Sequence, residues 1–203
     1  MSQLPLPIDL VRRGGQEVLI HGANAAAIAL LRDWLSWPSH CTILVGPPRS
    51  GRTLIGRLFG AETGATVVDD ADQADEERLF HLWNEAKDRA AVLLLIAAAP
   101  PPLWKIALPD LRTRLATAAV ARIDPPDEAI SAALIAHGLE LAGSAFAPDV
   151  PEYLARRTAR CYEDIDAVVT RLNALSLASG GKLSVASAQQ ALCNKDGLDV
   201  ADQ

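Results

Sequence analysis

The stretch that decides the fold is Gly46-Pro47-Pro48-Arg49-Ser50-Gly51-Arg52-Thr53. Its spacing is G-x-x-x-x-G-[K/R]-[S/T], in which the glycines let the backbone turn tightly and point its N–H groups at phosphate oxygens. A helix that begins after the second glycine adds the positive end of its dipole. A lysine normally reaches the β- and γ-phosphates from the position that Arg52 holds here. The pattern predicts a phosphate-binding P-loop at residues 46–53, with the hydroxyl of Thr53 placed on Mg²⁺.

Both flanks of this stretch have the pattern that a P-loop needs. The five residues before it, Cys41-Thr42-Ile43-Leu44-Val45, form a short apolar run typical of a strand. From Thr53 to Phe59 the apolar residues have helical spacing. Strand, loop and helix in this order favour a P-loop over the alternative, an incidental turn of glycine and proline. Because Arg52 replaces the usual lysine, we expect the chain to hold a nucleotide but to hydrolyse it slowly.

Further apolar runs alternate with helical patterns and predict a parallel α/β sheet. The expected strands are 65–70, 91–96 and 118–123, and the expected helices are 24–37, 75–90 and 108–115. The first of these strands ends in Asp69 and Asp70, at the edge where open α/β sheets bind ligands. In P-loop proteins such an acid holds Mg²⁺, so Thr53, Asp69 and Asp70 are the predicted metal site. The alternative for the two aspartates is a polar turn after a strand.

A boundary is expected at Asp124-Pro125-Pro126-Asp127. Strand patterns disappear after it, and helical spacing is found at 128–141, 151–158, 163–177 and 187–192. The predicted fold is therefore α/β, with a P-loop parallel sheet at 14–124 followed by a small all-α lid at 125–194. Residues 1–13 are interpreted as a lead-in and linker, and residues 195–203 as a flexible tail.

Composition narrows the classes of function. The 203 residues are half apolar, with a net charge of −6 and a pI of about 5.2. An acidic chain is not expected to be primarily a nucleic-acid binder, which normally has a basic face. No apolar run reaches the length of a membrane span, and no signal peptide is apparent. Three scattered cysteines and four histidines without metal-ligand spacing favour a reducing cytoplasm and argue against a metal cluster.

The P-loop, the Asp69-Asp70 strand end and the helical lid together resemble the AAA+ module of the DnaA family of bacterial replication initiators. The resemblance is closer to the DnaA-related Hda regulators, which inactivate the initiator and can also carry arginine at the position of Arg52. The segment 108–115, Leu-Pro-Asp-Leu-Arg-Thr-Arg-Leu, is similar to the family's L-P-D-L-x-S-R-L. Arg114 matches the finger of the box VII motif in that segment. The run from 157 to 172 is similar to the sensor 2 helix.

The first residues of the chain carry one more similarity. Gln3-Leu4-Pro5-Leu6-Pro7-Ile8 is similar to the Q-L-x-L-P-L peptide by which Hda docks on the DNA sliding clamp. The prolines favour an extended conformation, and the apolar side chains can fill a pocket. A disordered tail is the alternative for this segment. The resemblance extends to about residue 192, after which DnaA continues into its DNA-binding domain.

The resemblance implies a cytoplasmic negative regulator of DNA replication initiation. It would bind ADP (or ATP) with Mg²⁺ at 46–53, dock on the sliding clamp and contact ATP-bound DnaA. Arg114 would act in trans, so the chain would activate hydrolysis on DnaA more than act as an efficient ATPase itself. The alternative for Arg114 is a surface arginine. No sequence-specific nucleic acid and no membrane is expected as a partner, and a homo-oligomer is left open.

Three departures from the family pattern accompany this resemblance. Only 13 residues separate Thr53 from Val67, which predicts that one edge strand is missing. The residues 96–99 contain no polar sensor 1 group, and Glu163 falls at the sensor 2 arginine position. Arg160 is then the lid cation nearest to that position, with a surface or interlobe salt bridge as its alternative role. The rival functions are a self-acting P-loop ATPase, a non-hydrolysing AAA+ scaffold subunit and a shortened DNA-binding initiator.

Overall fold

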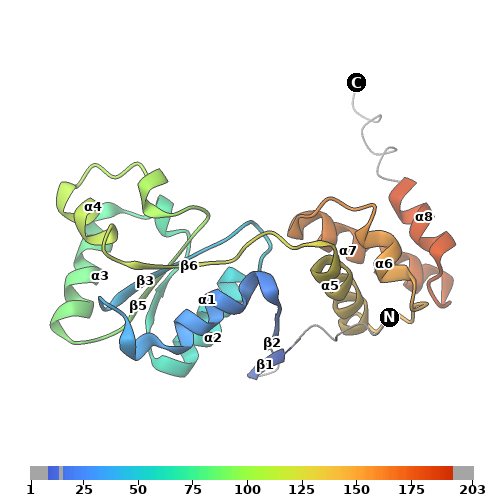
Figure 1. Cartoon of the computed structure of the whole chain (residues 1–203), viewed down its shortest axis with the longest axis horizontal. Coiled ribbons are helices and arrows are strands. Elements are labelled where there is room, and N and C mark those ends of the chain that lie inside the picture. The colour runs from blue at the N-terminus through green and yellow to red at the C-terminus, as the bar shows by residue number, and fades with distance from the viewer. Residues whose placement is uncertain (1–8, 14–15, 194–203) are drawn as a thin grey trace. The chain divides into compact units, whose positions relative to one another are not determined.

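A computed structural model of the protein describes residues 9–13 and 16–193 (Figure 1). The chain divides after Asp124 into two compact units, which are described separately below. Within the described residues, no helix has the length and apolar character needed to cross a membrane.

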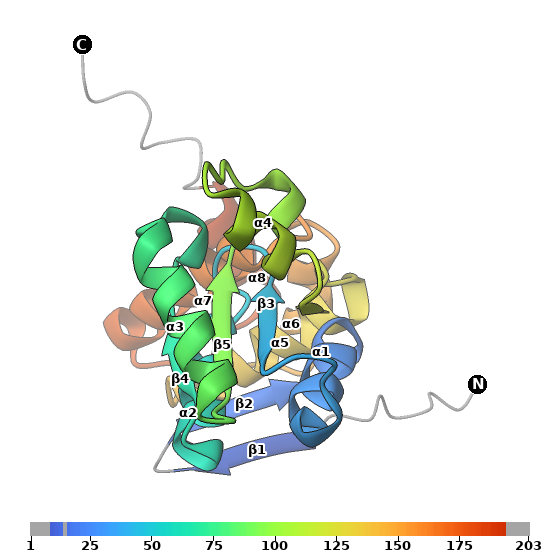
Figure 2. The same cartoon turned by 90° about the vertical axis from the view of Figure 1, so that its left-hand side faces the viewer.

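The first unit is built on a sheet of four parallel strands in the order β4-β5-β3-β6. Figure 2 shows β3 and β5 side by side, with their arrowheads at the same end. Both strands are buried along their whole length, because helices cover both faces of the sheet and each strand is a continuous apolar run. The strands are β3 (Cys41–Val45), β4 (Thr66–Val68), β5 (Leu93–Ala97) and β6 (Ala119–Arg122).

Alternate side chains of β5 face different helices. Leu93 and Leu95 belong to a core that also contains the apolar residues of α3 (Glu76–Asp88) and α4 (Pro109–Leu115). Ile96 points to the opposite face, against α2 (Arg52–Thr63). A Cβ added at Gly56 of α2 would overlap the Ile96 side chain, so this helix lies unusually close to the sheet. Gly56 therefore allows the short distance between α2 and the sheet, and this distance fixes the position of the loop before α2.

The predicted loss of an edge strand is confirmed. Helix α2 ends at Thr63, and Gly64 and Ala65 lead directly into β4. Gly64 has φ +75°, a left-handed conformation that suits glycine at a helix C-terminus. As a result β4 forms one edge of the sheet, and β5 is its one partner among the described strands.

The start of the first unit differs from the sequence interpretation. Residues 9–13, expected to belong to a linker, form strand β1 (Asp9–Arg13), which pairs antiparallel with β2 (Gln16–Ile20). The sequence signal was present, since two glycines between two short runs are typical of a β-hairpin. The helix expected at 24–37 is α1 (Gly22–Arg32), followed by a 3-10 turn at Trp34–Ser36. Two more 3-10 turns lie at Ala71–Gln73 and Pro101–Leu103.

The second unit is helical and has its own core, as expected for a lid. Its helices are α5 (Glu128–Leu141), α6 (Val150–Ala155), α7 (Tyr162–Ser179) and α8 (Val185–Cys193). Ile135, Leu139, Leu154 and Leu172 are fully buried at the centre of this bundle. The four residues come from three helices, so burial of their side chains holds the bundle together.

Candidate functional site

The loop between β3 and α2 is closely packed. Arg49 and Gly51 have positive φ angles of 60° and 85°, which turn the chain sharply before the helix begins. A Cβ at Gly46 would lie 2.9 Å from both Ile123 Cβ and Ser50 Oγ, so only glycine fits there. The local geometry thus has the tight turn and the helix N-terminus that a phosphate-binding loop requires.

Arg52 lies across the carboxyl ends of two strands. Its Nη1 donates to the carbonyl of Gly46, at 2.5 Å, and to the carbonyl of Ala97, at 3.1 Å. Gly46 follows β3 and Ala97 ends β5, so the guanidinium joins both strands at the edge where α/β sheets bind ligands. Because a guanidinium has five N–H donors, these two bonds leave three donors for an anion. The Arg52 position therefore fits contact with a phosphate.

The loop also contains a buried hydroxyl that has no protein partner. Ser50 Oγ is buried and makes no hydrogen bond to any residue that the structure describes. A buried polar atom without a partner is costly, and a phosphate oxygen would provide one. Its neighbour Thr53 is half-buried in the first turn of α2. Residues 46–53 thus lie in one loop and the first turn of α2, and together they form one candidate anion site.

The predicted metal ligands after β4 lie at the same edge of the sheet. Asp69 and Asp70 are both exposed, and the Asp70 N–H donates to Asp69 Oδ1 at 3.1 Å. Among the described residues, no three acidic, histidine or cysteine side chains form a cluster that could hold a metal ion. Mg²⁺ needs few protein ligands when it binds with a nucleotide, because phosphate oxygens and water complete its shell. Thr53 and these carboxylates have the donor chemistry for that arrangement.

The end of β5 has the apolar character that the sequence indicates. Ala97 is fully buried, and the next two residues, Ala98 and Ala99, also lack polar side chains. The Arg52 guanidinium donates to the Ala97 carbonyl at this strand end, and Trp104 Nε1 donates to the Ala99 carbonyl. The loop pattern predicted the place of Arg52, but its bond to Ala97, 45 positions away, has no local sequence signal.

Arg114 is half-buried on α4, and two residues of α3 hold its guanidinium. Nη1 donates to Asn84 Oδ1, and the guanidinium carbon lies 4.4 Å from the centre of the Phe80 ring. Within the described part of the chain, no acidic side chain pairs with Arg114. The similarity of the segment 108–115 to the family motif predicted Arg114, but Phe80 and Asn84 were not predicted, because in the sequence they look like ordinary residues of an amphipathic helix.

Glu76 connects the beginnings of α3 and α4. Its carboxylate accepts hydrogen bonds from the backbone N–H of Ala107, at 2.9 Å, and of Leu108, at 2.8 Å. These bonds hold the pKa of Glu76 below the usual value of a glutamate, and the positive charge of Arg112 adds to the effect. These two N–H groups belong to the residue before α4 and to its N-cap residue, Leu108, so Glu76 fixes the chain at the point where α4 begins.

The predicted lid residues lie in the second unit. Arg160 Nη2 is 3.6 Å from Glu128 Oε2, and both side chains are largely exposed. Glu163 is exposed in the first turn of α7. The role of Arg160 toward a nucleotide stays a prediction. The segment Gln3–Ile8 lies outside the described residues.

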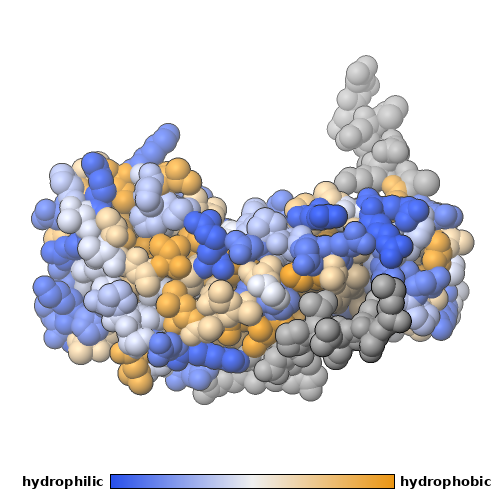
Figure 3. All heavy atoms as spheres, viewed as in Figure 1, coloured by the Kyte–Doolittle hydropathy of each residue, from blue (hydrophilic) through white to orange (hydrophobic). Residues whose placement is uncertain are grey.

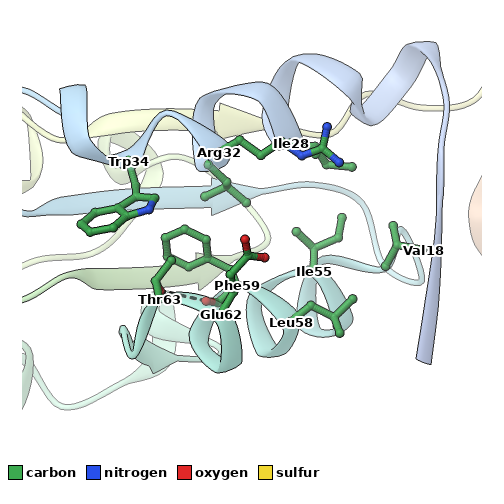
Figure 4. Close-up of a pocket in the computed structure, with 10 residues that line it drawn as sticks. Val18, Ile28, Arg32, Trp34, Ile55, Leu58, Phe59, Glu62 and Thr63 are labelled. Atoms are coloured by element: carbon green, nitrogen blue, oxygen red, sulfur yellow. Dashed lines mark hydrogen bonds between the residues drawn. The ribbon is translucent and has the colours of Figure 1, made fainter. Parts of the chain in front are cut away.

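A cavity of about 280 Å³ lies between α1 and α2 (Figure 4). Ile28, Ile55 and Phe59 supply apolar walls, and Trp34 lies at one end. Figure 3 shows apolar residues gathered over these two helices on the viewed face. All residues of α2 that line the cavity lie from Ile55 onward, along the body of the helix. The cavity is therefore distinct from the loop that precedes α2.

Known proteins resemble the chain in sequence and in structure. It is 30% identical over 132 residues to the chromosomal replication initiator protein DnaA of Thermomicrobium roseum, an alignment that covers 64% of this chain and 28% of that protein. Domain III of the Thermotoga maritima replication initiation protein DnaA superposes with a TM-score of 0.74 at 15% identity, over 86% of this chain and 93% of that one. A scan against protein-family models finds no match.

A further solved structure, AMPPCP-bound DnaA from Aquifex aeolicus, has a TM-score of 0.62 at 14% identity, over 75% of this chain and 62% of that one. The chain spans less than a third of the length of the curated DnaA relatives that it matches. The four-stranded parallel sheet, the P-loop and the helical unit define a P-loop protein with the AAA+ fold. The sequence relatives named DnaA and the fold of DnaA domain III together relate this chain to DnaA.

Proposed function

We propose that this protein is a negative regulator of replication initiation of the Hda type. It binds ADP and Mg²⁺ through residues 46–53, with Arg160 as a further phosphate contact, docks on the sliding clamp through residues 3–8, and stimulates hydrolysis of DnaA-bound ATP. The sequence relatives named DnaA support the link to replication initiation. The neighbours bound to AMPPCP support a nucleotide in the loop.

The observation that carries this proposal is the state of Arg114. Its guanidinium is half-buried, yet its contacts in the described part of the chain are an amide oxygen and an aromatic ring, both uncharged. Burying a cation beside neutral groups is unfavourable unless an anion arrives to pair with it. The γ-phosphate of a nucleotide on a partner is such an anion.

The chemistry proposed for Arg114 is electrostatic. As the bond to the γ-phosphoryl group breaks, negative charge develops on the transferring and leaving oxygens, and a guanidinium placed against them lowers the barrier. Arginine fingers increase the rate of hydrolysis by a factor of about 10³–10⁵ in other nucleotide hydrolases. The chain's own ATP hydrolysis is expected to be slow, because the end of β5 carries no side chain that could orient an attacking water.

The test is hydrolysis of ATP bound to DnaA, with sliding clamp loaded on DNA, in the presence and absence of this protein. Stimulation should be lost in Arg114→Ala while clamp binding is unchanged. Arg57→Ala is the matched control, since it removes the same charge from an exposed position on α2. A double variant, Leu4→Ala with Leu6→Ala, should lose clamp binding and, with it, stimulation.

Other outcomes would support the rival functions. Rapid ATP turnover by the purified protein alone would indicate a self-acting ATPase. Clamp binding without any stimulation of DnaA would indicate a scaffold subunit, and either result would contradict the proposed role of Arg114.

A further inference from the structure

Helix α3 holds the proposed finger from one side. Phe80 and Asn84 are four residues apart on α3, so their side chains lie on the same face of that helix. Arg114 reaches this face from α4, donates to the Asn84 amide oxygen and covers the Phe80 ring at 4.4 Å. The two contacts fix the guanidinium in both position and plane, since a hydrogen bond sets its edge and a ring sets its face.

The partners that hold Arg114 leave its charge uncompensated. Arg156 and Arg160 in the second unit both pair with the Glu128 carboxylate, which offsets their charge. By contrast, Asn84 and Phe80 are neutral. An amide and an aromatic ring can therefore orient the guanidinium without reducing the field that it exerts on an incoming phosphate.

A second link keeps α4 in place. Glu76, at the start of α3, accepts hydrogen bonds from the N–H groups of Ala107 and Leu108, immediately before α4. Arg114 joins the same two helices near the C-terminus of α4. Helix α4 is thus attached to α3 at both of its ends, and the finger is presented from a rigid pair of helices.

We infer that Asn84 and Phe80 are positioning residues for the Arg114 finger, and that their lack of charge matters as much as their shape. This inference rests on the proposed function. Both residues orient the guanidinium without neutralising it. We therefore expect their replacement to change the maximal stimulated rate of ATP hydrolysis and to leave the affinity for the ATP-loaded initiator nearly unchanged. The group that Arg114 contacts in this arrangement is the γ-phosphate of a nucleotide bound to another protein.

Asn84→Asp is the decisive variant. Aspartate has the shape of asparagine and still accepts the hydrogen bond from Arg114, so the thermal midpoint of the chain should be equal to or higher than that of the original protein. The new carboxylate neutralises the guanidinium, so the maximal stimulated rate should fall at least tenfold, as a lost charge-assisted contact does. The initiator concentration at half-maximal stimulation should change less than twofold.

Matched variants separate positioning from a structural role. Lys87→Gln is the control for charge, because it lowers the net charge of the protein by the same amount as Asn84→Asp but at an exposed position of α3. This variant should stimulate hydrolysis normally. Phe80→Leu should lose stimulation, whereas Phe80→Tyr keeps a ring under the guanidinium and should restore most of it. A purely structural contact would instead predict that Asn84→Asp is harmless.

The outcomes distinguish this inference from the proposed function. If Arg114→Ala abolishes stimulation but Asn84→Asp stimulates like the original protein, the positioning role is overturned and the finger stands. If the original protein does not stimulate hydrolysis at all, the finger is overturned and the positioning role falls with it. A tenfold loss in Asn84→Asp with normal stability and normal Lys87→Gln activity supports both.

Discussion

Gly46 shows how one residue controls the candidate phosphate site. An added methyl group would meet Ile123 Cβ at 2.9 Å, and that atom cannot move away without shifting the backbone of the neighbouring segment. The carbonyl of Gly46 also accepts the bond from Arg52. A change at this position therefore affects the loop, the adjoining segment and the loop cation together.

We predict that Gly46→Ala destabilises the first unit by about 1–3 kcal/mol, as overpacking of a tight site usually does. All four tryptophans of the chain lie before residue 125, so urea unfolding followed by tryptophan fluorescence reports on this unit. Asp88→Glu is the control, because it adds one carbon to an exposed side chain of the same unit, and it should change stability by less than about 0.5 kcal/mol. Equal effects of the two substitutions would contradict the close packing at Gly46.

At the scale of elements, Glu76 links two helices through an ionised carboxylate. Its pKa is lowered in the folded protein by hydrogen bonds from the N–H groups of Ala107 and Leu108. A lowered pKa in the folded state stabilises the protein above the pKa of the unfolded chain, and this contribution is lost as the pH falls through the folded value. We therefore expect the contact between α3 and α4 to weaken as the pH falls.

We predict that Glu76→Gln destabilises the first unit at neutral pH and that its difference from the original protein shrinks as the pH falls into the acidic range. Tryptophan fluorescence during urea unfolding at several pH values measures this difference. Glu77→Gln is the matched control, since Glu77 is exposed in the same first turn of α3. A deficit in Glu76→Gln that is independent of pH would show that the carboxylate charge is not involved.

Sequence alone predicted the elements better than the contacts between them. The strand before the P-loop has the expected bounds, and the other three sheet strands lie within two residues of their predicted positions, because an apolar run between helical patterns is a local signal. The pairing of β1 with β2 was not predicted, although two short runs separated by two glycines are a local sequence signal as well. The bonds from Glu76 to Ala107 and from Arg114 to Asn84 join residues about 30 positions apart, and no periodicity specifies such pairs.

At the scale of the whole molecule, the two units have separate cores, so nucleotide binding and folding can be followed in the first unit alone. The P-loop, the strand ends joined by Arg52 and the tryptophans all belong to that unit. A nucleotide that binds only the folded loop must raise the free energy of unfolding of this unit. Binding of the proposed nucleotide can therefore be measured as an increase in the free energy of unfolding.

We predict that ADP with Mg²⁺ stabilises the first unit by about 2.7 kcal/mol when free ADP is about 100 times its Kd. In Arg52→Ala the affinity should fall at least tenfold, because a charge-assisted hydrogen bond contributes about 1.5–3 kcal/mol. The shift caused by ADP is compared within each variant, since Arg52→Ala also loses its bonds to Gly46 and Ala97 and starts from a lower stability. Arg57→Ala, which removes an exposed charge from the same helix, should keep the full shift. No shift in the original protein would show that residues 46–53 do not bind ADP, whereas an equal shift in Arg52→Ala would show that the bound nucleotide does not use this guanidinium.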